Sequence, residues 1–426
     1  MAPQLTSFDV AIIGGGAAGI MAAFSVKHHH PSYSVAILDR TNELGRKFLT
    51  AGAGRGNLTN RNLDKGPDGF FHGDRSFISS IFTQFGYADI MKFFLELGVP
   101  VYEEKKTNKG KIFPVIDHAK TVRDMMVDAL REKGISIFCT TSVSAIVQNG
   151  DAWNIVSDKG DYSARVIILS SGGKTYPSLG SDGSGYDLAT STGHTIIPPV
   201  VSAVPIVSKN LLSHYLQGEK MIMQATSVVG GQDRTTAVGD VMFTQYGFSG
   251  PAILDISYDI SVRIHREKKT DTSVRLSFFP NTPAGDLRNI LEERWKQHPT
   301  YPVAHSLWGL LTQKASGAVC AVADIPKEQV SGELTPDEIN RLIQTLTAFT
   351  APATDTRGWN EAEFTAGGVD TLEVDGQTLA SKKANGLYLA GEILNVDGMV
   401  GGYNLSWAWA SGWVAGKMQG VSGLGA

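Results

Sequence analysis

Cysteine is almost absent from this chain: its 426 residues include two, Cys139 and Cys320, and no CxxC pair. The sequence therefore gives no support for a disulfide framework or a dithiol active site, and it favours a reducing cytoplasm as the location. Long hydrophobic runs are also missing, because the longest, residues 10–24, has only 15 residues and is rich in glycine. It is too short to cross a bilayer, and the residues before it lack the basic and hydrophobic segments of a secretory signal. We therefore expect no membrane association.

The chain also has no large excess of positive or negative charge. The chain carries 38 Lys and Arg residues against 42 Asp and Glu residues, a net charge of −4. Its densest basic cluster is Arg266 with Lys268 and Lys269, which we interpret as a solvated turn, so no nucleic-acid partner is expected. The hydrophobic content of 42% is ordinary for a globular protein, and the length predicts more than one core.

The motifs of metal and serine-hydrolase chemistry are not found either. HExxH, GxSxG and a paired-cysteine zinc pattern do not occur. The sequence GGKT at 172–175 resembles the end of a P-loop, but Ile168 stands where that motif needs glycine. The three histidines at 28–30 lie near an expected helix end, where a solvated C-terminus is favoured over a metal site. We therefore expect no bound metal.

Residues 9–40, in contrast, form a complete strand, glycine turn, helix and second strand. A β-branched run at 10–13 is typical of a buried parallel strand, and another follows at 35–38. The glycines between them fill the GxGxxG spacing: Gly14, Gly16 and Gly19. In this motif the first glycine allows a tight turn, the second lets the backbone approach a pyrophosphate, and the third lets the helix pack on the strand. Asp39, 20 residues after the last glycine, can accept hydrogen bonds from a ribose, so the unit predicts a dinucleotide site, with a plain βαβ turn as the alternative.

The segments that follow extend this α/β body to about residue 195. Helical periodicity occurs at 77–85, 90–97 and 121–133. A strand is expected at 135–140, a hairpin through 153–156 and a buried strand at 166–169.

The character of the sequence then changes twice. Residues 200–278 contain short β-type runs, and 283–350 carry helices, the last with a capping box of Thr335 and Glu338. A strand at 386–390 and a helix at 402–417 restore the α/β pattern. We therefore predict an α/β fold: a discontinuous Rossmann-like domain made of residues 1–195 and 360–426, interrupted by an inserted domain at 196–359.

Five stretches spread over the whole length resemble one known family. They are GGGAAGIMAA at 14–23, LGRKFLTAGAGRGNLTN at 44–60, SSGGKTYPSLGSDGSGYDLA at 170–189, MFTQYGFSGPAIL at 242–254 and GLYLAGEILNVDGMVGGYNLSWAWASGWVAG at 386–416. In these stretches the chain resembles the HI0933-like (YhiN-like) family of NAD(P)/FAD-dependent flavoprotein oxidoreductases. The resemblance implies FAD in an extended form on a glutathione-reductase-like Rossmann domain. It also implies a β-barrel-like and helical inserted domain that covers the isoalloxazine ring. It implies no particular substrate.

The resemblance also assigns parts of the cofactor to parts of the chain. Residues 14–19 would hold the pyrophosphate, residues 39–40 the adenosine end, and residues 46–47 the neighbouring ribose and phosphates. Residues 52–58 would run beside the flavin, while 402–405 would lie at its pyrimidine edge. Val143 would meet the adenine, and residues 391–392 the ribityl chain. The full set of predicted cofactor residues is Gly14, Gly16, Ala17, Ala18, Gly19, Asp39, Arg40, Arg46, Lys47, Gly52, Gly54, Arg55, Asn57, Leu58, Val143, Ser171, Gly172, Gly391, Glu392, Gly402, Tyr403, Asn404 and Leu405.

Two positions depart from the family pattern. Many relatives carry cysteine where this chain has Gly56, so a thiol role at that position is absent here. The acid after the late Ala-Gly pair is Glu392, where the broader flavoprotein pattern has aspartate, although the longer side chain can still reach a hydroxyl.

Residues 401–404 open the last expected helix and carry a hypothesis about redox tuning. The N–H groups and dipole of that helix could stabilise the negative charge of a reduced flavin, and a glycine turn before a core helix is the alternative. Residues 54–57 could likewise be an ordinary surface loop. Three tryptophans of the same helix are interpreted as packing residues: Trp407, Trp409 and Trp413.

These features lead us to expect an enzyme that transfers a hydride between flavin N5 and a small, hydrophobic organic substrate, for example at a C=C bond next to a carbonyl. No second GxGxxG follows a strand, so NAD(P)H is a candidate only for transient binding, and another electron carrier stays open. Such chemistry needs a proton donor or acceptor, and the sequence does not choose among Lys174, Tyr176, Tyr246 and Tyr403. Two alternatives stay open: a flavin-dependent RNA-modifying enzyme, which the mild acidity disfavours, and a flavin-binding sensor without turnover. The oligomeric state is not predicted.

Overall fold

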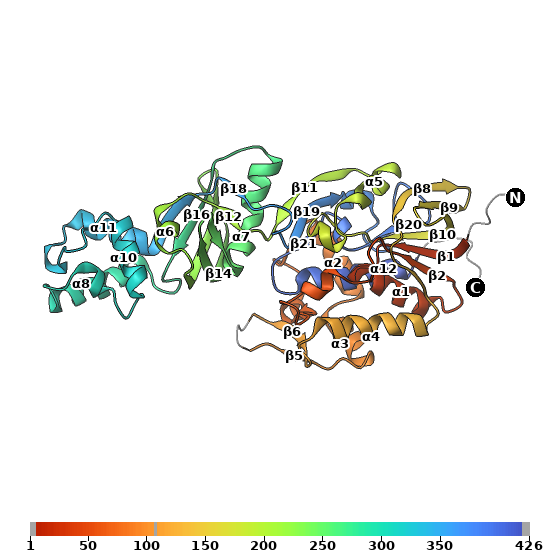
Figure 1. Cartoon of the computed structure of the whole chain (residues 1–426), viewed down its shortest axis with the longest axis horizontal. Coiled ribbons are helices and arrows are strands. Elements are labelled where there is room, and N and C mark those ends of the chain that lie inside the picture. The colour runs from red at the N-terminus through yellow and green to blue at the C-terminus, as the bar shows by residue number, and fades with distance from the viewer. Residues whose placement is uncertain (1–5, 106–108, 420–426) are drawn as a thin grey trace. The chain divides into compact units, whose positions relative to one another are not determined.

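The computed structural model describes residues 6–105 and 109–419. The chain divides into two compact units, which Figure 1 traces by residue colour. The first unit consists of Met1–Pro199 and Glu363–Ala426, and the second is Val200–Ala362. The polypeptide thus leaves the first unit once and returns to it.

The main sheet of the first unit has the strand order β7-β2-β1-β10-β9-β8, and β20 pairs with β10 as well. Its strands are β1 (Thr6–Ile13), β2 (Val35–Leu38), β7 (Ser136–Phe138), β8 (Val143–Asn149), β9 (Ala152–Ser157), β10 (Tyr162–Leu169) and β20 (Leu387–Leu389). Strands β7, β2, β1, β10 and β20 are parallel, whereas β9 and β8 form an antiparallel hairpin on β10. The first half of β10 pairs with β9 and its second half with β20, so two segments share one edge of this strand.

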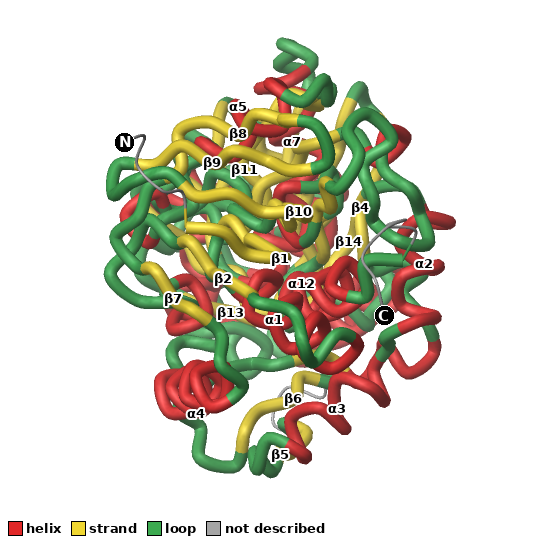
Figure 2. The backbone as a smooth tube through the Cα atoms, turned by 90° about the vertical axis from the view of Figure 1, so that its right-hand side faces the viewer, coloured by secondary structure: helices red, strands yellow, loops and turns green. Residues whose placement is uncertain are grey.

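Two helices from opposite ends of the chain pack against each other in this unit: α1 (Ala17–His29) and α12 (Tyr403–Gly416). Figure 2 shows them side by side next to the sheet. Glycines allow this close approach, because a Cβ atom on Gly412 would lie 2.3 Å from the backbone oxygen of Ala18. A Cβ atom on Gly416 would lie 2.5 Å from the backbone oxygen of Ala22. The two helices therefore meet backbone to backbone.

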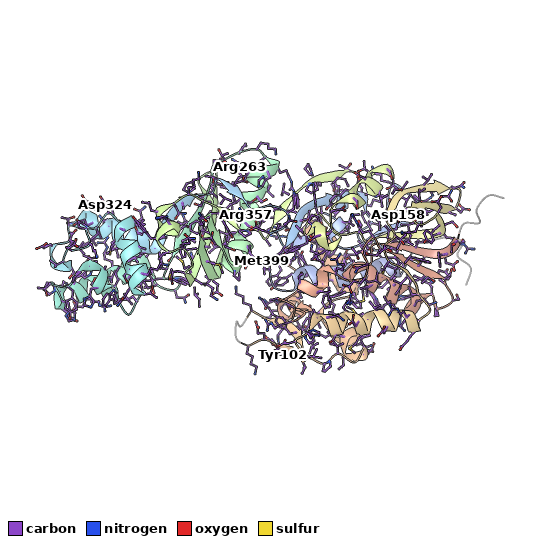
Figure 3. The ribbon with its side chains drawn as sticks, in the orientation of Figure 1. Tyr102, Asp158, Arg263, Asp324, Arg357 and Met399 are labelled. Carbon is purple, nitrogen blue, oxygen red and sulfur yellow. The ribbon has the colours of Figure 1, made fainter. Side chains whose placement is uncertain are left out.

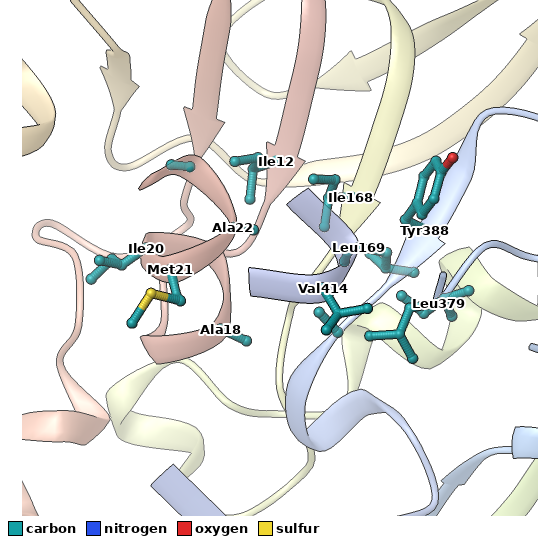
Figure 4. Close-up of a cluster of buried hydrophobic side chains, with 14 of the residues drawn as sticks. Ile12, Ala18, Ile20, Met21, Ala22, Ile168, Leu169, Leu379, Tyr388 and Val414 are labelled. Atoms are coloured by element: carbon teal, nitrogen blue, oxygen red, sulfur yellow. The ribbon is translucent and has the colours of Figure 1, made fainter. Parts of the chain in front are cut away.

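Apolar side chains from the sheet and both helices form the core of the first unit. Figure 4 shows part of this cluster, including Ile12, Ala18, Met21, Ile168, Leu169, Tyr388 and Val414. At the far end of α1, the Ser25 hydroxyl donates a 2.6 Å hydrogen bond to the backbone oxygen of Trp413. The unit is thus closed by contacts between its first and last segments.

Further helices, turns and strands complete the first unit. The helices are α2 (Arg75–Gln84), α3 (Tyr87–Glu96), α4 (Ala119–Glu132) and α5 (Ser184–Ser191). The short helical turns are η1 (Lys47–Thr50), η2 (Arg61–Lys65), η3 (Pro177–Leu179), η6 (Thr371–Glu373) and η7 (Gly391–Ile393). The remaining strands are β3 (Thr59–Asn60), β4 (Phe71–His72), β5 (Val101–Glu103), β6 (Lys111–Pro114), β19 (Phe364–Val369) and β21 (Asp397–Gly398), and β11 (Ile196–Ser202) leads into the second unit. The helices expected at 77–85, 90–97 and 121–133 correspond to α2, α3 and α4, while the strand expected at 135–140 is shorter, as β7.

The second unit is built on an antiparallel sheet with the order β17-β16-β13-β14-β15-β12-β18. Its strands are β12 (Ile206–Val207), β13 (Lys220–Val229), β14 (Gln232–Thr244), β15 (Gly247–Ser249), β16 (Thr272–Ser277), β17 (Phe349–Pro352) and β18 (Asp355–Thr356). A helix, α7 (Pro251–Ser261), packs on β13 and β14 and continues into the π-helical turn η4 (Val262–Arg266). The sequence interpretation, which expected only β-type runs here, missed α7, although Ala252, Ile253, Ile256 and Ile260 are buried at helical spacing.

Helices fill the rest of the second unit. They are α6 (Leu211–Tyr215), α8 (Ala284–Gln297), α9 (Val303–Ser306), α10 (Gln313–Val322) and α11 (Pro336–Ala348), with the turn η5 (Ser331–Glu333). The capping box predicted for α11 is confirmed, because the Thr335 hydroxyl accepts from the Glu338 N–H and the Glu338 carboxylate accepts from the Thr335 N–H. Across both described ranges, no helix has the length and apolar character that crossing a membrane requires.

Candidate functional site

The turn after β1 shows a division of roles among its glycines. Gly14 has a φ of +100°, and a Cβ atom there would lie 2.6 Å from the backbone oxygen of Ser170. A Cβ atom on Gly19 would lie 2.0 Å from the backbone oxygen of Gly14, so this glycine is needed for helix packing. A Cβ atom on Gly16 would meet nothing within 4 Å. The backbone at Gly16 therefore faces open space at the start of α1.

The N-terminus of α1 has the features of an anion-binding site. Gly16 is its N-cap, no side chain caps it, and no acidic residue lies in its first turn. The first hydrogen bond of the helix runs from the Ile20 N–H to the Gly16 oxygen, which leaves the earlier N–H groups, those of Ala17 and Ala18 included, outside the helical ladder. These N–H groups and the helix dipole favour a bound phosphate.

Asp39 holds this turn in place. Its Oδ2 accepts a 2.6 Å hydrogen bond from the Gly15 N–H, and its Oδ1 accepts from the N–H and hydroxyl of Thr41. Oδ2 accepts only this one bond and has a second lone pair, so the predicted bond to a ribose remains compatible with these contacts. The Thr141 N–H donates to the backbone oxygen of Asp39, so the segment that precedes Val143 lies beside Asp39.

Arg40, predicted at the adenosine end, pairs with a residue that the sequence interpretation did not single out. Its guanidinium forms an ion pair with Asp182, in the loop after η3. The same loop lies against Thr41, because a Cβ atom on Gly180 would come within 2.5 Å of the Thr41 methyl group. The glycine-rich sequence SDGSG was the available signal for this loop.

Lys47 and Glu392, predicted for different parts of the cofactor, form an ion pair of 2.7 Å. The Lys47 ammonium also donates a 2.7 Å hydrogen bond to the hydroxyl of Thr175. The other oxygen of Glu392 accepts from the Thr365 N–H at 2.9 Å. Sequence reasoning missed both threonines, which are fully buried; neither belongs to a motif whose spacing reveals a partner. Arg46, next to Lys47, is the half-buried N-cap of η1.

The loop at 57–60 and the start of α12 are joined by several hydrogen bonds. The Trp409 indole donates to the backbone oxygen of Leu58 at 2.9 Å, and the side chain of Asn60 donates to the backbone oxygen of Gly401 at 2.9 Å. Gly402 has a φ of +103°, and a Cβ atom on it would lie 2.6 Å from the backbone oxygen of Thr59. Residues 57–60 and 401–409 are far apart in sequence but therefore pack against each other, and we call these two segments together the wall.

The side chain of Asn57 supplies a buried acceptor in this wall. The side-chain oxygen of Asn57 is buried and makes no hydrogen bond to any described residue. It lies next to Gly402, since a Cβ atom there would be 3.0 Å away. A buried polar atom without a partner is unfavourable, so this oxygen is suited to a ligand N–H. The buried hydroxyl oxygen of Ser171, beside Gly172, likewise has no partner among the described residues.

Other predicted residues have structural contacts of their own. The Arg55 guanidinium lies 4.0 Å from the centre of the Phe113 ring and donates to Glu104 at 2.9 Å. A Cβ atom on Gly52, which has a φ of +58°, would lie 2.6 Å from the same ring. Gly54 continues this turn with a φ of +86°. This part of the loop is held by its side-chain packing.

The side chains at the start of α12 also serve the fold. Tyr403 is stacked on Phe70 with ring centroids 4.7 Å apart, and Asn404 bonds to both the N–H and the oxygen of Gly398. Leu405 packs against the core. The backbone N–H groups of this helix end are therefore the better candidates for cofactor contacts. Trp407 and Trp409 are buried, as their predicted packing role requires.

The four candidates for proton transfer are in different surroundings. Tyr403 is buried, and its hydroxyl accepts from the Asn62 side chain. Tyr176 follows β10 with a φ of +56°, and burial raises the pKa of its hydroxyl. Lys174, two residues earlier, is exposed. Tyr246 belongs to the second unit, where the Arg357 guanidinium labelled in Figure 3 lies 4.8 Å from the centre of its ring.

Taken from one end to the other, the first unit fits an extended dinucleotide such as FAD. Open backbone at a helix N-terminus suits the diphosphate, and the carboxylate of Glu392 with its spare lone pairs suits a hydroxyl. The side-chain oxygen of Asn57 has no partner in the described part of the chain. This oxygen and the N–H groups at the start of α12 suit the edge of a flavin ring, which has both donors and acceptors.

Comparison with known proteins gives matches over nearly the whole chain. The model of the HI0933-like protein Rossmann domain matches residues 8–418. The 3-dehydro-bile acid delta(4,6)-reductase of Clostridium scindens is 34% identical over 409 residues, which cover 96% of this chain and 98% of the relative. The ribosomal RNA dihydrouridine synthase of Escherichia coli is 28% identical over 406 residues, covering 95% and 96% of the two chains.

Solved structures of flavoenzymes are similar as well. The 3-ketosteroid-delta4-(5alpha)-dehydrogenase of Rhodococcus jostii RHA1 matches with 14% identity and a TM-score of 0.48 over 99% of this chain and 98% of that one. The FrdA subunit of E. coli quinol fumarate reductase matches with 14% identity and a TM-score of 0.49, over 97% and 70%.

Proposed function

The chain belongs to the HI0933-like family of FAD-dependent oxidoreductases. On this basis we propose that it reduces a C=C bond conjugated to a carbonyl in a small, hydrophobic molecule. In this proposal NAD(P)H supplies the electrons by transient binding. The proposal includes no separate NAD(P)H domain, since no second GxGxxG follows a strand in the sequence.

The observation that carries the proposal is the 34% identity with the bile acid delta(4,6)-reductase over almost the full length of both chains. A 3-dehydro compound with a Δ4 double bond is an enone. Uridine is converted to dihydrouridine by saturation of a C=C bond that is likewise conjugated to a carbonyl. The names of the two relatives therefore describe one reaction type on two substrate classes.

The residues of the first unit would divide the work of holding FAD. Gly16 and the N-terminus of α1 would bind the diphosphate, Asp39 and Arg40 would lie toward the adenosine, and Glu392 would bind a hydroxyl of the ribityl chain. Asn57 and the N–H groups from Gly402 onward would meet the ring edge, where the positive end of the α12 dipole favours negative charge. When bound, the flavin supplies hydride transfer at its N5 atom.

Reduction of an enone also needs a proton, and Tyr176 is the best-suited donor in the first unit. The preceding residue, Thr175, contacts Lys47 and Glu392, so Tyr176 follows directly on the proposed cofactor residues. Burial raises the pKa of its hydroxyl, so the phenol is protonated at neutral pH, but the same shift makes it a weaker acid than an exposed tyrosine. Tyr403 is less suited, because its ring is stacked on Phe70 and its hydroxyl already has a partner. A Tyr176→Phe variant should keep flavin reduction by NAD(P)H and lose at least tenfold in the reoxidation of that flavin by an enone.

The proposal is tested by anaerobic mixing of the purified flavoprotein with NADH and NADPH, followed by a panel of enones. Bleaching of the flavin by either nucleotide, then recovery of its colour on addition of a 3-oxo-Δ4-steroid or a smaller cyclic enone, is the expected result. A flavin that every donor leaves oxidised would instead favour a flavin-binding sensor. A reduced flavin that no enone reoxidises would refute the proposed substrate class.

A second candidate, the modification of ribosomal RNA, has the 28% identity with the dihydrouridine synthases in its favour. The charge of the chain disfavours it, since residues 200–362 carry 15 Lys and Arg against 17 Asp and Glu and thus offer no excess of cations for a phosphate backbone. Incubation of the reduced enzyme with unmodified ribosomal RNA, followed by assay for dihydrouridine, separates the two candidates. Dihydrouridine in the product would replace the small-molecule proposal.

A further inference from the structure

Both carboxylate oxygens of Glu392 are held by the protein. One oxygen, Oε1, accepts a 2.9 Å hydrogen bond from the Thr365 N–H, and the other, Oε2, lies 2.7 Å from the Lys47 ammonium. The three residues come from β19, from η1 and from η7, which directly follows β20. A carboxylate fixed on both oxygens cannot rotate freely, so its unused lone pairs point in set directions.

The Lys47 ammonium is committed to this arrangement. It donates to Glu392 and to the hydroxyl of Thr175, both at 2.7 Å, and its side chain is only 27% exposed. The Thr175 hydroxyl is itself within 3.4 Å of Glu392 and 3.3 Å of the backbone oxygen of Glu363. Two of the three N–H donors of Lys47 therefore have protein acceptors, and the Glu392 carboxylate balances its charge, which leaves one donor for any further contact.

Gly173 is the residue that lets these segments meet. A Cβ atom on it would lie 2.4 Å from the Thr365 hydroxyl oxygen and 3.1 Å from the carboxylate carbon of Glu392. The same Thr365 oxygen accepts a 2.8 Å hydrogen bond from the Lys174 N–H. The sequence GGKT, which resembles a P-loop, therefore has a packing role: its glycine gives Thr365 and Glu392 access to each other.

We propose that Lys47, Thr175 and Thr365 are positioning residues, which orient the Glu392 carboxylate toward a hydroxyl of the cofactor. Lys47 then acts through Glu392 and makes no contact of its own with the diphosphate. This inference rests on the proposed placement of Glu392 beside the ribityl chain. It reassigns Lys47, which the family resemblance placed at a ribose and phosphates.

A double-mutant cycle on FAD affinity tests this assignment without any substrate. The dissociation constant of FAD is measured by fluorescence titration for Lys47→Met, Glu392→Gln and the double variant. We expect each single variant to weaken binding about tenfold, the effect of one hydrogen bond to a charged group, and the double variant to be no weaker than the worse single one. A double variant about a hundredfold weaker than wild type would overturn the inference, because independent ligands multiply their effects.

Arg46→Met is the matched control, since it removes the neighbouring cation, and its effect should multiply with that of Glu392→Gln. Titration with FMN, which lacks the adenosine and the second phosphate of FAD, gives a further readout. Lys47→Met should weaken FMN and FAD by the same factor, and a loss confined to FAD would contradict the assignment. An FAD affinity unchanged in Glu392→Gln alone would instead refute the placement of Glu392 itself.

Thr175 provides a conservative pair that separates positioning from folding. Thr175→Ser keeps the hydroxyl beside Lys47 and should retain the FAD affinity, whereas Thr175→Val removes it and should weaken binding severalfold. Far-UV circular dichroism and thermal unfolding show whether each variant is folded. Equal FAD affinities in the folded serine and valine variants would exclude Thr175 from the group.

Discussion

Replacing Gly412 with alanine adds one methyl group to α12 at the point where this helix crosses α1. The new Cβ atom would lie 2.3 Å from the backbone oxygen of Ala18, whereas ordinary contacts of a Cβ atom begin at 3.4 Å. The obstacle is backbone, which cannot turn away as a side chain can. The helices must therefore separate by about 1 Å, and a well-packed interface resists such a change.

Two opposing effects set the magnitude of this change. Alanine in place of a helical glycine favours folding by about 1 kcal/mol. Overpacking disfavours it by about 1–3 kcal/mol, and a clash with backbone belongs at the upper end. We therefore expect Gly412→Ala to lower the free energy of unfolding of the first unit by about 2 kcal/mol. Its FAD affinity should fall as well, because α1 and α12 carry the two proposed ends of the cofactor site.

The assay is denaturation in guanidinium chloride, followed by far-UV circular dichroism and by the fluorescence of released flavin. Gly317→Ala is the matched control, since it makes the same substitution in α10, where a Cβ atom would meet nothing within 4 Å. This variant should be stabilised by up to about 1 kcal/mol in the second unit and keep its flavin. A Gly412→Ala protein that releases flavin at the same denaturant concentration as wild type, or at a higher one, would refute the reasoning.

Three further predictions follow from single contacts. Gly402→Ala should abolish flavin binding, seen as loss of the visible spectrum, because φ is +103° and the methyl group would lie 2.6 Å from the Thr59 oxygen; a yellow protein would contradict this. Trp409→Phe should leave the Leu58 oxygen buried without its donor, lower stability by about 1–3 kcal/mol and speed FAD release in stopped-flow measurements, and an unchanged release rate would argue against that role. The Phe77 N–H, at the start of α2, donates to the Asp74 carboxylate and lowers its pKa below the ordinary 3.8. The ionised carboxylate therefore stabilises the folded protein fully above pH 3.8. This stabilisation is lost as the pH falls through the lower pKa that Asp74 has in the folded state. Asp74→Ala should therefore cost about 1 kcal/mol in urea unfolding at pH 7 and progressively less below pH 3.8, and a difference that persists at pH 2 would contradict it.

The sequence predicted those features whose causes lie close together in the chain. The glycine turn, its two strands and Asp39 occupy one stretch of about thirty residues with fixed spacing, so the Rossmann-like fold could be recognised without a structure. The capping box of α11 was visible for the same reason, because all its partners lie within one helical turn.

Features that depend on distant partners were not visible. In the sequence, Gly412 and Gly416 are only two glycines inside a predicted helix. The structure shows that they allow the close packing of α12 on α1. Thr365 has no local motif, although its N–H fixes Glu392. Helix α7 was missed because the segments around it in the sequence are strands. Its apolar face is buried by packing on β13 and β14, which the local sequence does not reveal.

The contact between Ser25 and Trp413 joins residues 388 positions apart, and the strand β20 that completes the edge of β10 also comes from the last fifth of the chain. During translation, residues 200–362 leave the ribosome as one uninterrupted stretch, while the first unit is complete only after its second segment, which begins at residue 363, has followed. We therefore expect the cofactor to bind only after α12 has been synthesised. A chain released early, without residues 403–416, would carry the whole opening motif and still lack the helix that α1 packs against.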